Sequence, residues 1–181
     1  ALGYMPKSRK KRNEQQRSLA YFDPKQRRFS ESVRNIRTAM SLMALDKPLQ
    51  VIEVTSSQPK EGKTTVSMNL AFAFAALERV LLIDADLRKP SVGARCKLPS
   101  YQPGLANVLA GTAELDECIV KNVHEGVEVM PAGALPLNPM ELLAGAGLQS
   151  LLAQLKGQYD KIIIDTAPVQ AVSDPLLLAP H

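Results

Sequence analysis

The chain has 181 residues, 45% hydrophobic and 22% charged, a composition that suits one globular domain with a single core. Its longest apolar run, residues 70–77, has eight members, far fewer than the roughly 18–20 needed to cross a bilayer. The two cysteines, Cys96 and Cys118, lack the spacing of a zinc site or a disulfide framework, which fits a reducing compartment. The net charge of +4 is uneven, because residues 1–37 carry +8 and the rest of the chain −4.

Residues 1–28 are polar, basic and aperiodic, and we interpret them as a linker that ends near Pro24, with folding expected after it. They begin without Met and contain no signal-peptide core, which predicts that the chain is cut from a longer protein. The basic run of residues 7–12 suits an anionic membrane surface. Nucleic acid would also suit, but no aromatic side chain is interleaved with the run, so we expect no nucleic-acid partner. A solvated, flexible linker is the alternative.

The first predicted element is a helix over residues 30–45, with apolar residues at helical spacing and Ser30 as its N-cap. Strands and helices then alternate: strand 51–54, loop 55–62, helix 64–77, strand 80–83, helical pieces 104–109 and 115–120, strand 127–130, helix 141–159 and strand 162–164. Short, wholly apolar strands that alternate with helices are typical of a parallel sheet covered on both faces. The predicted fold class is therefore α/β, with a mostly parallel sheet.

The loop of residues 57–65 has the sequence Ser-Gln-Pro-Lys-Glu-Gly-Lys-Thr-Thr and lies between a predicted strand and a predicted helix, where a phosphate-binding loop belongs. Ser57 stands where the usual pattern has its first glycine. Backbone N–H groups of such a loop point at phosphate oxygens, Lys63 supplies a cation for the β- and γ-phosphates, and Thr64 offers a hydroxyl to Mg²⁺. An exposed turn that caps a helix is the alternative, but the strand–loop–helix context favours nucleotide binding. The predicted cofactor-binding residues are Ser57, Pro59, Glu61, Gly62, Lys63, Thr64 and Thr65.

Two further predicted strands end in carboxylates. Residues 80–83 run into Asp84-Ala-Asp86-Leu-Arg88, and residues 162–164 run into Asp165. The carboxyl ends of strands are where α/β sheets place ligands. Either segment alone could use its aspartate only to cap the following loop. Three such strand ends together predict a Mg–ATP site, in which catalysis consists of positioning and charge neutralisation.

With these motifs, residues 30–181 resemble the bacterial tyrosine kinases, which have a P-loop NTPase-like fold. Residues 57–65 are similar to their Walker A motif, residues 82–90 to their Walker A′ motif Asp-x-Asp-x-Arg, and residues 162–168 to their Walker B motif. Residues 104–111 and 131–143 also resemble connecting segments of that family. The resemblance implies that residues 29–181 are an ATP- and Mg²⁺-dependent protein tyrosine kinase domain.

The resemblance also implies roles for single residues. Lys63 would bind phosphate, and Asp84 would be the base that accepts the tyrosine proton. Mg²⁺ would be held, directly or through water, by Thr64, Asp86 and Asp165. Arg88 would steady either the transferred phosphate or only its own loop.

Several partners are implied by the resemblance alone. The pattern Glu31-x-x-Arg34-x-x-Arg37 is similar to a motif by which the family assembles into a homo-oligomeric ring, and weak i, i+3 pairs on a solvated helix are its alternative. Residues 1–28 would be the juxtamembrane linker that follows a membrane-spanning chain-length regulator region, on the cytoplasmic side of the bacterial inner membrane. The implied process is exopolysaccharide or capsule polymerisation and export. The implied substrate is the tyrosine-rich tail of a neighbouring subunit, with a tyrosine phosphatase opposing the kinase.

The sequence departs from the family in its tyrosines, because no C-terminal cluster is present and the four tyrosines are scattered at Tyr4, Tyr21, Tyr101 and Tyr159. The chain also stops where the family's next core strand would follow, so we expect it to lack the C-terminal strands and tail, which leaves self-phosphorylation open.

Two alternative functions are also compatible with these motifs. A regulatory ATPase of the partition and division-site class would place a signature lysine where this chain has Gln58, and a nucleotide-sensing scaffold would bind ATP without kinase turnover.

Overall fold

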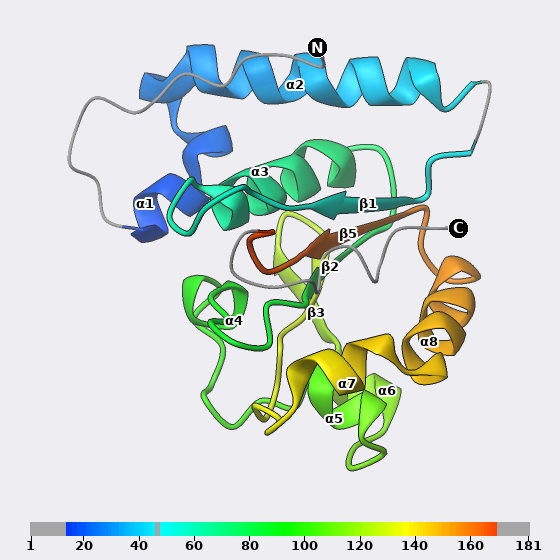
Figure 1. The fold of residues 1–181 in the computed structure, drawn as a ribbon. Coiled ribbons are helices and arrows are strands. Elements are labelled where there is room, and N and C mark those ends of the chain that lie inside the picture. Colours follow the sequence, from blue (N-terminus) through cyan, green and yellow to red (C-terminus); the bar gives the residue numbers. More distant parts are fainter. Residues whose placement is uncertain (1–13, 46–47, 170–181) are drawn as a thin grey trace.

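The computed structural model describes residues 14–45 and 48–169 and contains one five-stranded sheet in the order β1-β5-β2-β4-β3 (Figure 1). Four strands are parallel neighbours, and β3 pairs antiparallel with β4. Their bounds are β1 Val51–Val54, β2 Val80–Asp84, β3 Val120–His124, β4 Val127–Met130 and β5 Lys161–Asp165. The four predicted strands and the α/β fold class are confirmed, while the edge strand β3 was not predicted.

Helices cover both faces of this sheet (Figure 1). Helix α3 (Lys63–Ala75) packs on one face, and α2 (Arg27–Met43) lies over α3. The opposite face is covered mainly by α5 (Leu105–Leu109), α7 (Pro139–Ala144) and α8 (Ala146–Lys156). Two four-residue helices, α4 (Val92–Arg95) and α6 (Leu115–Cys118), complete the connections.

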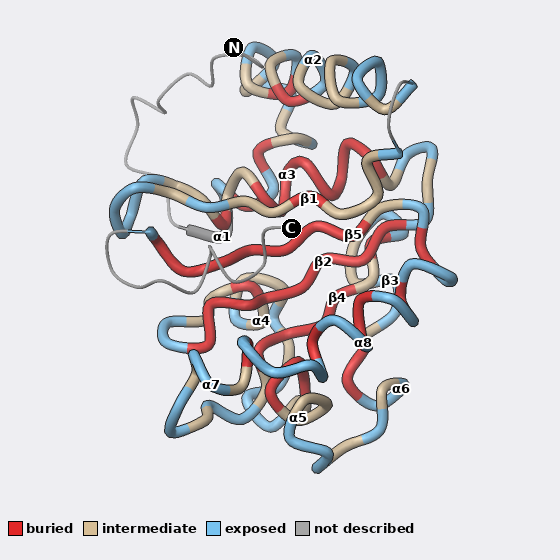
Figure 2. The backbone as a smooth tube through the Cα atoms, turned by 45° about the vertical axis from the view of Figure 1, so that its right-hand side comes forward, coloured by how far each residue is buried: buried red, intermediate tan, exposed pale blue. Residues whose placement is uncertain are grey.

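Side chains of each central strand alternate between two hydrophobic cores. Leu82 of β2 and Ile163 of β5 pack against α3, whereas Leu81 and Ile162 pack against the α5, α7 and α8 side. Both strands are buried along almost their whole length, as Figure 2 shows in red. Such burial explains why these strands are continuous apolar runs in the sequence and were predictable from it.

The predicted linker boundary after residue 28 is wrong for residues 14–28, because they fold onto the domain. Helix α1 (Glu14–Ser18) and two 3-10 helices, Ala20–Phe22 and Pro24–Gln26, precede α2. We call residues 14–26 the N-terminal segment. Its Ser18 is fully buried and Ala20 is 2% exposed. Ser30 is not the N-cap of α2, which begins at Arg27. Its hydroxyl instead donates to the carbonyl of Tyr21, at 2.9 Å. Residues 1–13, with their basic run, lie outside the described residues.

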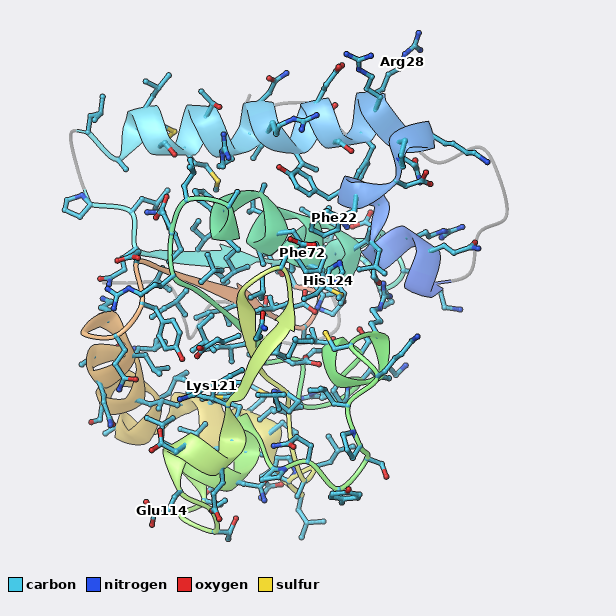
Figure 3. The ribbon with its side chains drawn as sticks, turned by 180° about the vertical axis from the view of Figure 1, so that it is seen from behind. Phe22, Arg28, Phe72, Glu114, Lys121 and His124 are labelled. Atoms are coloured by element: carbon cyan, nitrogen blue, oxygen red, sulfur yellow. The ribbon has the colours of Figure 1, made fainter. Side chains whose placement is uncertain are left out.

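Three sets of contacts attach the N-terminal segment to α3 and to the neighbouring elements α4 and β3. Asn69 of α3 accepts a hydrogen bond from Tyr21 N at 2.6 Å and donates to the carbonyl of Arg17 at 3.2 Å. Arg95 of α4 donates to the hydroxyls of Ser18, at 3.2 Å, and of Thr65, at 3.1 Å. An aromatic cluster, visible in Figure 3, completes the attachment with centroid distances of 4.8–5.2 Å between Phe22, Phe72 and His124.

Two further predictions about helices need correction. The helix predicted over residues 141–159 is two helices, because Gly145 is extended (φ −71°, ψ 156°) between α7 and α8. The helical piece predicted over residues 115–120 ends at Cys118, since Val120 already belongs to β3. In residues 14–45 and 48–169, no helix is both long enough and apolar enough to span a bilayer.

Candidate active site

The phosphate-binding loop joins β1 to α3 through two residues with positive φ, Lys60 (68°) and Gly62 (94°). Gly62 lies directly before α3, where left-handed backbone favours glycine. The Glu61 carboxylate accepts hydrogen bonds from the backbone N–H groups of Ser57, at 2.9 Å, and Gln58, at 3.1 Å. Glu61 therefore stabilises the conformation of the loop. Its carboxylate accepts hydrogen bonds from backbone N–H groups of the kind that bind phosphate.

Lys63 lies between two carboxylates that come from different strand ends. Its Nζ is 3.0 Å from Asp165 Oδ1 and 3.6 Å from Asp86 Oδ2. The Lys63 side chain is 8% exposed and that of Asp165 only 1%. Burying an ion pair of this kind costs desolvation free energy, and buried charged groups in close contact are frequent at functional sites. Lys63, Asp86 and Asp165 therefore form a candidate functional site.

Asp165 is also the acceptor for two hydroxyls of α3. Thr64 Oγ1 donates to its Oδ2 at 2.7 Å, and Ser67 Oγ donates to its Oδ1 at 2.9 Å. Ser91, in the turn before α4, donates to Thr64 Oγ1 at 3.1 Å. The Thr64 hydroxyl therefore lies where the carboxyl ends of β2 and β5 meet, because Asp84 and Asp165 are directly opposed in the parallel register.

Asp84 is fully buried, and its carboxylate is occupied by three backbone N–H groups. Oδ2 accepts from Ser91 and Val92, both at 2.9 Å, and Oδ1 accepts from Asp86 at 3.2 Å. Burial, followed by the charge of Asp165, raises the pKa of Asp84 from 3.8 to about 7, and the two amides of residues 91 and 92 and the Lys63 ammonium oppose this rise. Asp84 thus caps the turn before α4 and titrates near neutral pH.

The structure brings together most of the predicted site but not all of it. Lys63, Thr64, Asp84, Asp86 and Asp165 converge at one edge of the sheet. Arg88 is exposed. Sequence reasoning missed Ser67 and Ser91, whose hydroxyls complete the polar network, because isolated serines carry no motif.

The predicted assembly motif lies on α2, which packs against α3, and its residues have contacts within the chain. Glu31 pairs with Arg27 at 3.2 Å, and the Arg34 guanidinium is 5.7 Å from the centroid of the Tyr21 ring. Arg37 donates to the carbonyl of Ala73, near the end of α3, at 3.0 Å.

Oxygen donors at the site fit a magnesium ion. In the part of the chain that the structure describes, no three His, Cys, Asp or Glu side chains form a metal cluster. Thr64, Asp86 and Asp165 supply a hydroxyl and two carboxylates. That set suits Mg²⁺, which is usually held by one or two carboxylates together with substrate phosphates.

Comparison with known proteins identifies the family. The AAA domain family matches residues 49–178. The kinase domain of the Escherichia coli tyrosine kinase ETK superposes with a TM-score of 0.87 at 31% identity, covering 98% of this chain and 72% of that one. The VpsO kinase domain gives a TM-score of 0.77 at 42% identity, covering 87% and 78%. Tyrosine-protein kinase YwqD of Bacillus subtilis is 36% identical over 91% of this chain and 69% of its own length. This chain belongs to the bacterial tyrosine kinases.

The bacterial tyrosine kinases it matches differ in length. The chain spans 69% of YwqD but 24% of tyrosine-protein kinase wzc of Salmonella typhimurium, to which it is 33% identical. It therefore corresponds to the P-loop protein-tyrosine kinase domain of these relatives, and the resemblance drawn from the motifs is confirmed.

The partition and division-site class shares the fold but matches less well. The septum site-determining protein MinD of Pyrococcus horikoshii, complexed with Mg-ADP, gives a TM-score of 0.57 at 29% identity and covers 71% of this chain and 54% of that one. Kinase domains are thus favoured over the ATPase alternative. The P-loop fold that this tyrosine kinase domain shares with MinD is one that binds a nucleotide together with a divalent metal ion.

Proposed function

We propose that this domain transfers the γ-phosphate of ATP, bound with Mg²⁺, to tyrosine side chains of a neighbouring subunit. The observation that carries the proposal is the convergence on Asp165, which contacts the Lys63 ammonium at 3.0 Å and the Thr64 hydroxyl at 2.7 Å. A cation and a metal-ligating hydroxyl beside carboxylates at a loop–helix junction are the parts that phosphoryl transfer needs.

Nucleotide phosphates would bind to the backbone N–H groups of residues 57–65. The amides of Ser57 and Gln58, now bonded to Glu61, would be shared with or released to phosphate oxygens. Lys63 would leave its two carboxylates to contact the β- and γ-phosphates. Bound Mg²⁺ neutralises phosphate charge, and Thr64, Asp86 and Asp165 would hold it.

Asp84 is the proposed base that accepts the tyrosine proton. A pKa of about 7 suits a general base that works near neutral pH. Because three backbone amides now occupy its carboxylate, the turn of residues 86–92 must shift before a phenol can reach it. Arg88, exposed in this same turn, would then steady the transferred phosphate.

The wider setting is proposed from the family. Glu31, Arg34 and Arg37 would join subunits into a ring, and their present contacts with Arg27, Tyr21 and α3 would have to adjust on assembly. A membrane-spanning chain-length regulator region would precede the domain on the cytoplasmic side of the inner membrane. The tyrosine-rich tail of a neighbouring subunit would be the acceptor, an opposing phosphatase would reverse the reaction, and the process served would be exopolysaccharide or capsule polymerisation and export.

The test measures phosphotyrosine on a tyrosine-containing polymer, and free phosphate, with Mg–ATP. We expect the chain to label the polymer and Lys63→Met to abolish labelling while its circular dichroism spectrum stays unchanged. Lys60→Met is the matched control, because Lys60 lies in the same loop but is exposed. Phosphate release without phosphotyrosine would instead support the partition-type ATPase. ATP binding with neither product would support the nucleotide-sensing scaffold.

A further inference from the structure

The described tyrosines differ in how accessible their hydroxyls are. Tyr101 is 85% exposed, whereas Tyr159 is 7% exposed and donates its hydroxyl to the Glu128 carboxylate. Tyr21 is half-buried, with its ring packed edge-on against Phe22 at 5.2 Å and covered by the guanidinium of Arg34. A phenol oxygen must come within about 3–3.5 Å of the γ-phosphorus to react, which requires a side chain that can enter another protein's site. Among the described tyrosines, Tyr101 meets this requirement best.

Tyr101 lies in a turn of residues 99–102. The turn connects α4 to α5, and the arrowheads of β1 and β5 in Figure 1 point toward the side on which α4 and this connection lie. Backbone bonding closes the turn, since Gln102 N donates to the carbonyl of Pro99 at 3.1 Å. The Gln102 side chain also donates to the carbonyl of Glu117 at 2.8 Å. The backbone that carries the Tyr101 phenol is thus held in place by hydrogen bonds.

Both ends of this turn are anchored. Leu98 N donates to the carbonyl of Gly93 at 2.9 Å, and Leu105 N donates to that of Pro131 at 2.8 Å. At Gly104 the backbones are so close that an added Cβ would lie 1.9 Å from the Pro131 oxygen. These contacts hold the turn in place at both ends. Transfer from another copy of the chain would leave the turn undisturbed.

We propose that Tyr101 is a phosphorylation site of this domain, modified in trans by a second copy. The inference rests on the proposed kinase function. In the step, the Tyr101 oxygen forms a bond to the γ-phosphorus of ATP in the partner copy, and the bond from that phosphorus to the β–γ bridging oxygen breaks. ADP leaves, and the phenol proton passes to the partner's carboxylate base. Tyr101 supplies an acceptor within the folded domain, separate from any tyrosine-rich tail.

The experiment mixes two forms of the whole chain. The donor is the unmodified chain, and the acceptor is a ¹⁵N-labelled chain with Lys63→Met, so that mass spectrometry assigns each phosphopeptide to its source. With Mg–ATP we expect phosphate on Tyr101 of the acceptor, at a rate that rises with donor concentration. Adding Tyr101→Phe to the acceptor should lower the phosphotyrosine found on its residues 14–169 at least tenfold. Tyr21→Phe, the matched control, should leave it unchanged.

Three outcomes would overturn the inference. An acceptor that stays unphosphorylated on Tyr101, while the donor labels a tyrosine-containing polymer, would remove Tyr101 as a site and leave the kinase function standing. Phosphate on Tyr101 of the donor alone, at a rate independent of concentration, would refute transfer between copies. No labelling of either chain or of the polymer would overturn the kinase function and this inference together.

Discussion

Replacing Asp84 by Asn should change how stability depends on pH, because the folded protein holds the proton of this buried carboxyl more tightly than the unfolded chain. Its pKa is raised from 3.8 to about 7, mainly by burial. Between these two values the folded state binds more protons than the unfolded state, so stability falls as pH rises and levels off above about pH 7. Integrated from pH 5 to pH 8, this single group costs about 2–3 kcal/mol.

Asparagine at this position cannot ionise, and its hydrogen bonds can be worked out from the structure. Its amide oxygen could still accept from the N–H groups of Ser91 and Val92, but its NH₂ would face the N–H of Asp86. That donor–donor contact costs about 1–3 kcal/mol at every pH. Asp84→Asn should therefore be less stable than the parent at pH 5, and the deficit should shrink or reverse by pH 8.

The assay is urea unfolding followed by circular dichroism at several pH values between 5 and 8, without nucleotide. Asp160→Asn is the matched control, because the pKa of this exposed aspartate is lowered to about 2, chiefly by its hydrogen bond with Arg79. Its stability difference from the parent should stay constant over the range. Parallel pH profiles for Asp84→Asn and the parent would refute the reasoning.

Three other predictions concern packing and ligand binding. Asn69→Ala should lower the free energy of unfolding by about 1–3 kcal/mol, because it leaves backbone groups of the N-terminal segment unpaired, and denaturant titration would show it. Gly104→Ala should lower the melting temperature far more than Gly147→Ala. A Cβ at residue 104 would lie 1.9 Å from the Pro131 oxygen, whereas a Cβ at residue 147 would meet nothing closer than 3.7 Å. Equal effects of the two substitutions would contradict this prediction. Mg–ADP should raise the melting temperature of the parent by several degrees and that of Thr64→Ala by clearly less, since the hydroxyl that we propose as a metal ligand is gone.

The parallel strands were predictable because a strand that is buried on both faces consists of a continuous run of apolar residues. β2 and β5 are almost wholly buried, and their runs end in the aspartates that identify the site. β3 was missed because it is a half-exposed edge strand that contains Lys121 and Asn122, and it has neither a clean alternation nor an apolar run. The separation of α7 from α8 had a signal, since two glycines, Gly145 and Gly147, interrupt the predicted helix.

The N-terminal segment and the environment of Asp84 could not be read from the sequence, because both depend on contacts between distant residues. Ser18 is buried although its surroundings in the sequence are polar, and its hydroxyl receives a hydrogen bond from Arg95, 77 positions away. Asp84 was predicted as a reacting carboxylate from its motif. Only the conformation of the turn that follows shows that Ser91 and Val92 already occupy it.

The attachment of the N-terminal segment to α3 makes a short mechanical linkage. The Asn69 amide holds the backbone of this segment at Arg17 and Tyr21, and it lies six residues beyond Lys63 on one unbroken helix. Tension applied to the chain ahead of residue 14 would load these hydrogen bonds and the Phe22 contacts before it reached the sheet. Helix α3 would then carry the load near its middle, while its N-terminal end stays bonded to Asp165 through Lys63, Thr64 and Ser67.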